Sequence, residues 1–167
     1  DVQVPGLPVQ AAAGFRAAAA SGTAVMRAAR HIDVNGNGAS DLFFFSHSTG
    51  RLVVWYMNGN VRTAYSTSAI PGTHYVVGSG NFSDDLREDL LLADTNAGTL
   101  YLGISNGATL TEQALPYTST SRAIAAGDFD GNGKSDILLF DSTAGKITPW
   151  YMVNGNRVAD ASQALTT

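Results

Sequence analysis

The chain has 167 residues, which is long enough for one domain with a sizeable core. Charged residues make up only 14% and the net charge is −4 with no cluster of Lys and Arg, which argues against nucleic acid and anionic membranes as partners. No cysteine is present, which excludes disulfides, thiolate zinc sites and a cysteine nucleophile.

The first segment, residues 1–23, differs from the rest of the chain. It holds two of the five prolines and an alanine-rich stretch, and it contains no acidic loop. Two interpretations are open: a linker or frayed helix, or an arm that packs on one of the repeated units described below or on another subunit.

The remaining sequence consists of three tandem copies of one repeat, at 24–71, 72–118 and 119–167. Each copy has an acidic landmark, and these landmarks are Asp41, Asp89 and Asp136, spaced 48 and 47 residues apart. A glycine follows nine residues after each landmark, at Gly50, Gly98 and Gly145. Because independent landmarks keep one register, we interpret the pattern as a true repeat.

Each copy predicts four short strands. In the first copy they are expected around 24–32, 42–46, 51–57 and 61–66. An Asn-Gly pair precedes the fourth strand in all three copies, and this pair supplies the positive φ values of a two-residue hairpin turn. Four antiparallel strands in a repeat of this length are typical of a β-propeller blade. The sequence therefore predicts an all-β fold of three four-stranded antiparallel blades.

The candidate metal ligands lie in the loop between the first two strands of each copy. In the third copy it reads DFDGNGKSD, with Gly133 at position 6 to permit a sharp turn. Oxygen side chains without nitrogen or sulfur ligands favour Ca²⁺ over transition metals. The candidate ligands, at positions 1, 3, 5 and 9 with the carbonyl at position 7, are Asp128, Asp130, Asn132, Asp136 and Lys134.

The first loop, DVNGNGASD, offers the same pattern with two carboxylates instead of three, so weaker Ca²⁺ binding is expected. Its candidate ligands are Asp33, Asn35, Asn37, Asp41 and the carbonyl of Ala39. The second loop, 81–89, is degenerate: Leu86 stands where the turn favours glycine, and Arg87 lies beside it. Whether this loop binds metal is left open, and for all three the alternative is a solvated turn stabilised by its Asn and Asp side chains.

These loops, the apolar strand behind each, and the segments WYMNGN (55–60) and WYMVNGN (150–156) resemble FG-GAP/VCBS repeats. The resemblance covers about 24–167 and is weaker in the second copy. It implies integrin-α-like β-propeller blades with Ca²⁺ in these loops, and an extracellular binding or scaffolding module that is secreted or exposed at the cell surface.

Two further sequence features are explained better by structural roles than by functional ones. The segment GISNG (103–107) matches a hydrolase nucleophile pattern, but Ser105 precedes a hairpin rather than a helix, so no catalytic role is expected. Trp55 and Trp150 suit core packing better than a sugar-binding platform. No pair of catalytic residues can be named, and we expect no enzyme activity.

Three blades are fewer than a closed propeller has, so their outer faces need cover. The fold is therefore a partial propeller or one completed by oligomerisation. The expected partners are further copies of the chain or further blades of a longer chain, with glycans or surface proteins as possible ligands. The expected function is a calcium-binding repeat module acting by binding or self-assembly, as an adhesin, lectin-like or filament subunit. The alternative is an accessory non-catalytic domain of a secreted polysaccharide-active enzyme.

Overall fold

The computed structural model describes residues 25–27, 32–94, 96–116, 121–161 and 163–165. The segment 1–23, for which an arm or a linker is expected, lies outside the described residues. So does part of the first predicted strand, since residues 28–31 are not described.

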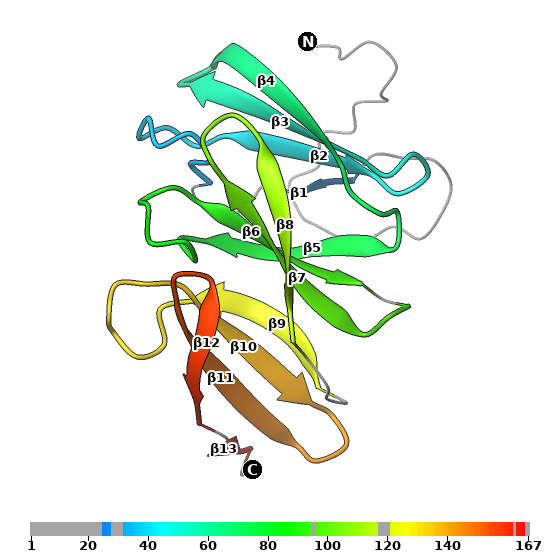
Figure 1. The fold of residues 1–167 in the computed structure, drawn as a ribbon, viewed down its shortest axis with the longest axis vertical. Helices are drawn as coiled ribbons and strands as arrows, with labels where there is room; N and C mark the ends of the chain where they lie inside the picture. The colour runs from blue at the N-terminus through cyan, green and yellow to red at the C-terminus, as the bar shows by residue number, and fades with distance from the viewer. Residues whose placement is uncertain (1–24, 28–31, 95, 117–120, 162, 166–167) are drawn as a thin grey trace.

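The described residues form three antiparallel sheets that follow one another along the chain (Figure 1). Blade one contains β1 (Val25–Arg27), β2 (Leu42–Ser46), β3 (Arg51–Asn58) and β4 (Val61–Ala69). Blade two contains β5 (His74–Gly80), β6 (Asp89–Asp94), β7 (Thr99–Ser105) and β8 (Leu110–Leu115). Blade three contains β9 (Arg122–Gly127), β10 (Asp136–Asp141), β11 (Lys146–Val153), β12 (Asn156–Asp160) and the short β13 (Gln163–Ala164).

Within each blade, consecutive strands are neighbours, so every blade is a simple meander. The blades lie one above another in Figure 1, with blade one at the top and blade three at the bottom. None of the three sheets closes on itself. The predicted all-β class, with three four-stranded antiparallel blades, is confirmed, and β13 adds a short extra pairing to β11.

The apolar strands of blade two use both faces because this blade lies between two others. In β2, Phe43 and Phe45 face blade two, whereas Phe44 belongs to a separate cluster on the other face. Blade two is covered on both sides: Leu90 and Leu92 pack toward blade one, and Leu91 packs toward blade three. Continuous apolar runs therefore encode stacked sheets here, rather than half-exposed ones.

The Asn-Gly hairpins differ among the blades. In blade three, Asn154 and Gly155 are the two loop residues, and both have positive φ, of 48° and 72°. In blade one, Asn58 pairs with Val61, so the loop shifts by one residue and only Gly59 has positive φ. Blade two has a longer loop between β7 and β8. The prediction of an Asn-Gly two-residue turn is thus right for blade three and wrong for the other two, because an Asn-Gly pair does not fix the strand register by itself.

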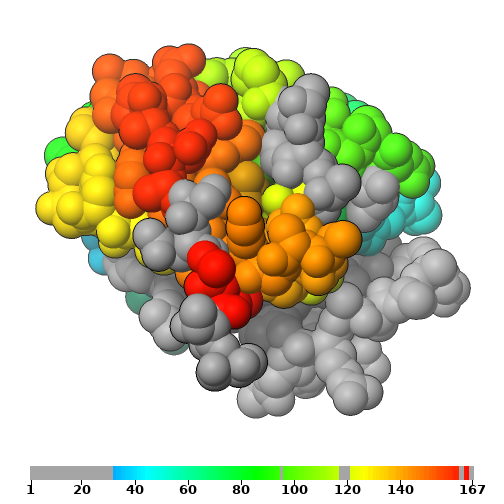
Figure 2. Space-filling model, turned by 90° about the horizontal axis from the view of Figure 1, so that it is seen from below, coloured from blue at the N-terminus to red at the C-terminus, as the bar shows by residue number. Residues whose placement is uncertain are grey.

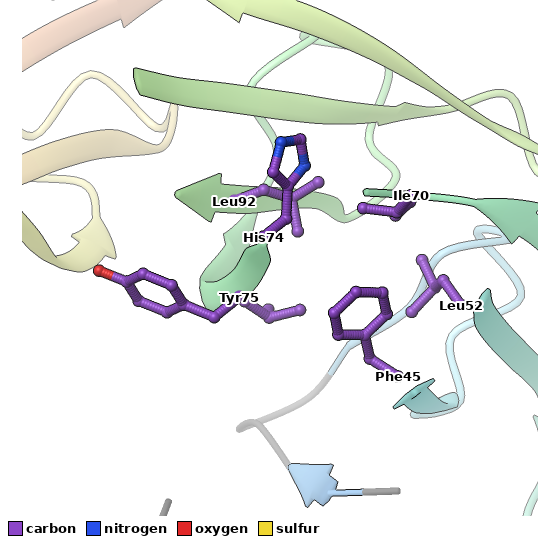
Figure 3. A pocket seen from close by; sticks show the side chains of 7 residues that line it. Phe45, Leu52, Ile70, His74, Tyr75 and Leu92 are labelled. Carbon is purple, nitrogen blue, oxygen red and sulfur yellow. The ribbon is translucent and has the colours of Figure 1, made fainter. Parts of the chain in front are cut away.

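A narrow gap lies between blades one and two (Figure 3). Apolar side chains such as Phe45, Leu52 and Leu92 line it, together with His74, and it has no room for a water molecule. His74 is buried, stacks on Tyr101 and contacts two carboxylates. The gap is a packing feature rather than a ligand pocket.

The described part of the chain contains no apolar helix long enough to cross a membrane.

Candidate metal centre

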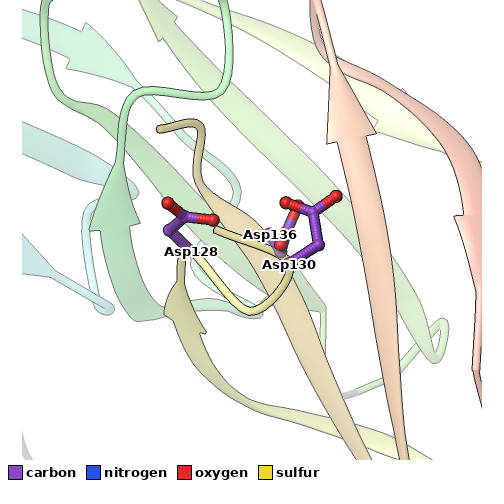
Figure 4. A group of neighbouring side chains, drawn as sticks. All are labelled: Asp128, Asp130 and Asp136. Carbon is purple, nitrogen blue, oxygen red and sulfur yellow. The ribbon is translucent and has the colours of Figure 1, made fainter. Parts of the chain in front are cut away.

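The third loop brings three carboxylates together (Figure 4). Asp128 and Asp130 are exposed in the loop after β9, and Asp136 is buried at the start of β10. One oxygen from each lies within 4.8 Å of the other two. Two oxygens that share one Ca²⁺ lie at most about 5 Å apart, since Ca–O distances are about 2.3–2.6 Å. The donor set and its spacing therefore fit a Ca²⁺ ion.

Backbone geometry shapes the loop around these oxygens. Gly131 and Gly133, at positions 4 and 6, have φ of 78° and 83°, which side chains with a Cβ adopt only at a cost. Asp128 accepts the backbone N–H groups of Gly131, Asn132 and Gly133 at 2.8–3.1 Å. The hydrogen bond from the N–H of Gly133 is the main reason that the pKa of Asp128 lies below its ordinary value. This carboxylate is thereby favoured in the ionised form that a cation requires.

The first loop has the same architecture. Gly36 and Gly38 have φ of 77° and 82°, and Asp33 accepts the N–H groups of Gly36, Asn37 and Gly38. Asn35 accepts the N–H of Asn37, as Asp130 accepts that of Asn132 in the third loop. The amide of Asn35 thus stands where the third loop has a carboxylate. Within the described residues, the group of three metal-competent carboxylates is found in the third loop and not in the first.

The aspartate at position 9 has a second role that is common to all three loops. Asp41, Asp89 and Asp136 each hold the loop to the third strand, accepting one N–H from loop position 2 and one from β3, β7 or β11. All three are buried, and burial raises the pKa of Asp41 and of Asp89. The aspartate at position 9 therefore links the loop to the third strand in each blade, whether or not a metal is bound.

The second loop keeps the backbone shape without its glycines. Asp84 and Leu86 occupy positions 4 and 6 with φ of 62° and 68°, the same left-handed region as the glycines of the other loops. The turn for which glycine is favoured at position 6 therefore forms with Leu86 in its place, at the cost of backbone strain.

Side-chain cations accompany the second loop. The guanidinium of Arg87 lies 2.6 Å from the carboxylate of Asp85, and Lys134 of the third loop forms an ion pair with Asp84. Burial would raise the pKa of Asp85, but hydrogen bonds from the N–H and side chain of Arg87 outweigh it and leave the pKa low. Three buried side-chain oxygens, on Asn81, Ser83 and Asp84, have no hydrogen-bond partner among the described residues. The loop thus has the shape of the other two but a different charge balance.

The loops also contact one another across the blades. The N–H at position 8 of one loop donates to the carbonyl at position 1 of the loop before it: Glu88 to Asp33 at 2.9 Å, and Ser135 to Asn81 at 3.2 Å. The carbonyl at position 2 accepts a second bond from the next blade, from Ser105 to Val34 and from Gly155 to Phe82. These paired contacts fix adjacent blades in one repeated orientation.

Sequence reasoning missed this inter-blade role of Ser105 and the ion pair between Lys134 and Asp84. The hydroxyl of Ser105 is buried, donates to Val34 and accepts the N–H of Gly107, which is a structural role. A sequence signal did exist, because Ser105 is the polar residue at a position where the other copies have methionine. For Lys134, the sequence predicted a role only for the backbone carbonyl. No local feature of the sequence indicates that the side chain pairs with Asp84.

Comparison with known families identifies part of the chain. Residues 81–139 match the model of an FG-GAP-like repeat, from the first residue of the second loop through the third loop into β10. The resemblance to FG-GAP repeats is confirmed for this segment, which includes the three carboxylates. No curated protein and no solved structure matches the chain.

The match and the fold together define the class of protein. The chain carries an FG-GAP-like repeat within an all-β array of propeller-type blades. Repeats of this class are typically non-catalytic, often bind Ca²⁺ and occur in extracellular proteins.

Proposed function

We propose that the protein is a secreted or cell-surface module whose blades are stabilised by Ca²⁺ and which acts by binding or self-assembly. The observation that carries the proposal is the convergence of Asp128, Asp130 and Asp136 on one point of the third loop. In this proposal, Asn132 and the carbonyl of Lys134 complete that site, and the ion supplies positive charge that holds the loop oxygens together.

The first loop is proposed as a weaker site of the same kind, formed by Asp33, Asn35, Asn37, Asp41 and the carbonyl of Ala39. Its hydrogen-bond pattern matches that of the third loop, and the replacement of one carboxylate by an amide supports the weaker affinity.

Assembly is favoured over glycan recognition by the placement of the aromatic residues. Trp55 and Trp150 are both buried, at 6% and 5% exposure, so their rings are used in packing. Arg62 and Arg157 lie over these rings at 4.8 and 4.6 Å from the ring centroids. Neither tryptophan offers an open face to a sugar ring.

Calorimetric titration with Ca²⁺ tests the metal sites. The parent protein should bind at about 10⁻⁴ to 10⁻³ M, the range of extracellular modules. Asp130→Ala should abolish the stronger site, and Asn35→Asp should tighten the weaker one. Asp160→Ala removes an equal charge from an exposed position in β12 and should leave both sites unchanged. The absence of binding heat at millimolar Ca²⁺ would refute the proposal.

Thermal unfolding links the metal to the fold. A ligand present at 100 times its dissociation constant stabilises the native state by about 2.7 kcal/mol. For a chain of this size, that corresponds to a melting temperature higher by roughly 5–11 °C. EDTA should therefore lower the melting temperature of the parent by several degrees and leave Asp130→Ala less affected. An unchanged melting curve after confirmed metal removal would show that the loops are metal-free turns.

A further inference from the structure

The second and third loops share an interface that includes a proposed ligand of the metal centre. The two loops are joined by a hydrogen bond, and Figure 2 shows blade three, in yellow, orange and red, in front of blade two, in green. Lys134 is at position 7 of the third loop, where its carbonyl is proposed to bind Ca²⁺. The second loop contacts both the side chain of this lysine and the peptide group that contains its carbonyl.

The peptide group between Lys134 and Ser135 is held from one side. The N–H of Ser135 donates to the carbonyl of Asn81 in the second loop at 3.2 Å. The described residues contain no cis peptide bond, so the carbonyl of Lys134 and the N–H of Ser135 point in opposite directions across one peptide plane. The hydrogen bond to Asn81 therefore sets the direction of the carbonyl of Lys134, which points away from this partner.

The side chain of Lys134 is held by the same loop. Its ammonium group forms an ion pair with one carboxylate oxygen of Asp84, and this oxygen also accepts the N–H of Asn154 at 3.2 Å. The other oxygen of Asp84 is buried without a hydrogen-bond partner among the described residues. The side chains of Asp84 and Lys134 are 15% and 33% exposed, so loss of the ammonium would leave a partly buried carboxylate poorly compensated.

Position 4 of the second loop is where this contact departs from the repeat. The first and third loops have Gly36 and Gly131 there, whereas the second loop has Asp84. Arg87, at position 7 of the second loop, lies against Gly36: a Cβ atom added to this glycine would lie 3.5 Å from Cγ of Arg87. Position 7 thus meets position 4 of the loop before it in both pairs of loops. Of the two position-4 residues contacted in this way, Asp84 is the one that carries a charge.

We infer that Asp84 is a positioning residue for the metal centre of the next blade. The carboxylate is not itself a ligand of that centre. By holding the ammonium of Lys134, alongside the hydrogen bond from Ser135 to Asn81, it fixes the peptide group whose carbonyl would bind the ion. The inference rests on the proposed Ca²⁺ site in the third loop, and it makes the affinity of that site depend on two blades.

Electrostatic attraction alone predicts a different result. Removing the carboxylate of Asp84 would weaken the binding of a nearby cation, whereas removing the ammonium of Lys134 would strengthen it, because like charges repel. If the pair positions the carbonyl, loss of either partner weakens binding, and loss of both has no further effect. Lys134→Met is therefore the variant for which the two explanations predict opposite signs.

Calorimetric titration of the full chain with Ca²⁺ compares Asp84→Asn, Lys134→Met and the double variant. Asn tolerates the left-handed backbone at position 84, where φ is 62°, and Met keeps the apolar length of the lysine and its backbone carbonyl. Each single variant should weaken the stronger binding event, the one that Asp130→Ala abolishes, by about tenfold, as expected for a residue that holds a metal ligand in place. The double variant should bind no more weakly than either single variant.

Two controls remove the same charges elsewhere. Asp85→Asn removes a carboxylate of the second loop that pairs with Arg87 of its own loop. Lys146→Met removes an exposed lysine at the start of β11. Both variants should leave the affinity nearly unchanged. A loss in Asp85→Asn equal to that in Asp84→Asn would show that net charge is responsible, and it would overturn the inference.

Amide hydrogen exchange in EDTA, followed by NMR, gives a readout that needs no metal. The N–H of Ser135 should exchange slowly in the parent and lose protection in both single variants, because its peptide group is then less firmly held. The amides of β10 and β11 should keep their protection, which would show that blade three remains folded. Unchanged exchange of Ser135 in both variants would show that the ion pair does not hold the peptide group.

The titrations separate this inference from the metal proposal. A parent that gives no binding heat at millimolar Ca²⁺ refutes the metal site and the inference with it. A parent that binds, with Lys134→Met binding equally or more tightly, refutes the inference alone. A double variant whose loss of affinity is the sum of the two single losses does the same, since independent residues show additive effects.

Discussion

The aspartate at position 9 of the second loop offers a test of how this residue links the loop to the third strand of its blade. Asp89 is fully buried, and its carboxylate accepts the N–H groups of Phe82, Ser83 and Ser105 at 2.8–3.0 Å. Because no metal site is proposed in this loop, Asp89→Asn changes the link between the loop and the third strand without changing a metal site. The amide has one oxygen and one NH₂ group, so it cannot accept on both sides as the carboxylate does.

The magnitude follows from the groups left without partners. If the amide oxygen faces Phe82 and Ser83, the NH₂ group meets the N–H of Ser105, and two buried donors lose their acceptor. Each buried unsatisfied group costs about 1–3 kcal/mol, so we expect a loss of about 2–6 kcal/mol. For a chain of this length, a loss of about 3 kcal/mol lowers the melting temperature by roughly 6–12 °C.

Urea unfolding in EDTA measures this loss. Trp55 and Trp150 report blades one and three by fluorescence, and circular dichroism reports all strands. Asp85→Asn is the control, because Asp85 makes a partly exposed ion pair with Arg87 and such pairs contribute about 0–1 kcal/mol. Equal unfolding midpoints for Asp89→Asn and Asp85→Asn would show that the aspartate at position 9 does not stabilise the blade by linking its loop to its third strand.

Two further predictions concern the same loops. Burial raises the pKa of Asp89, so the part of its contribution that depends on protonation, as distinct from its hydrogen bonds, is fully present below the ordinary pKa of 3.8 and is lost as pH rises through the raised folded value. The destabilisation by Asp89→Asn should thus be larger at acid than at neutral pH in urea unfolding, and an equal difference at both would contradict the assignment. Leu86→Gly relieves a positive φ that costs about 1–2 kcal/mol and should stabilise the protein by up to about 1 kcal/mol. Gly38→Ala, at the same loop position and without any clash, should destabilise it, and the reverse order of the two melting temperatures would show that the backbone is unstrained.

Repetition made much of the fold predictable. The spacing of Asp41, Asp89 and Asp136 set the repeat, and the strand predicted at 42–46 is the observed β2. Local patterns succeed here because each blade is a meander of neighbouring strands, so its main-chain contacts are short in sequence. The family resemblance could also be recognised from the loop residues, since the glycines and the acidic spacing are local features.

The second loop shows where local reasoning fails. Its sequence lacks glycine at positions 4 and 6, where the other two loops have it, yet Asp84 and Leu86 adopt the same left-handed conformation. Contacts from outside the loop hold them there. Asp84 pairs with Lys134 of the next blade, and the N–H of Glu88 donates to Asp33 of the blade before. Tertiary contacts of this kind outweigh a local preference of about 1–2 kcal/mol per residue.

The sequence by itself determined the three copies, their strands and the oxygen-rich loops, because these depend on residue type and spacing along the chain. Only the tertiary structure decided which equivalent positions are covered. Val34, Phe82 and Phe129 occupy the same place in three similar loops, but only the first two are buried. Burial depends on whether another described sheet lies against the position, which the type and spacing of the loop residues do not indicate.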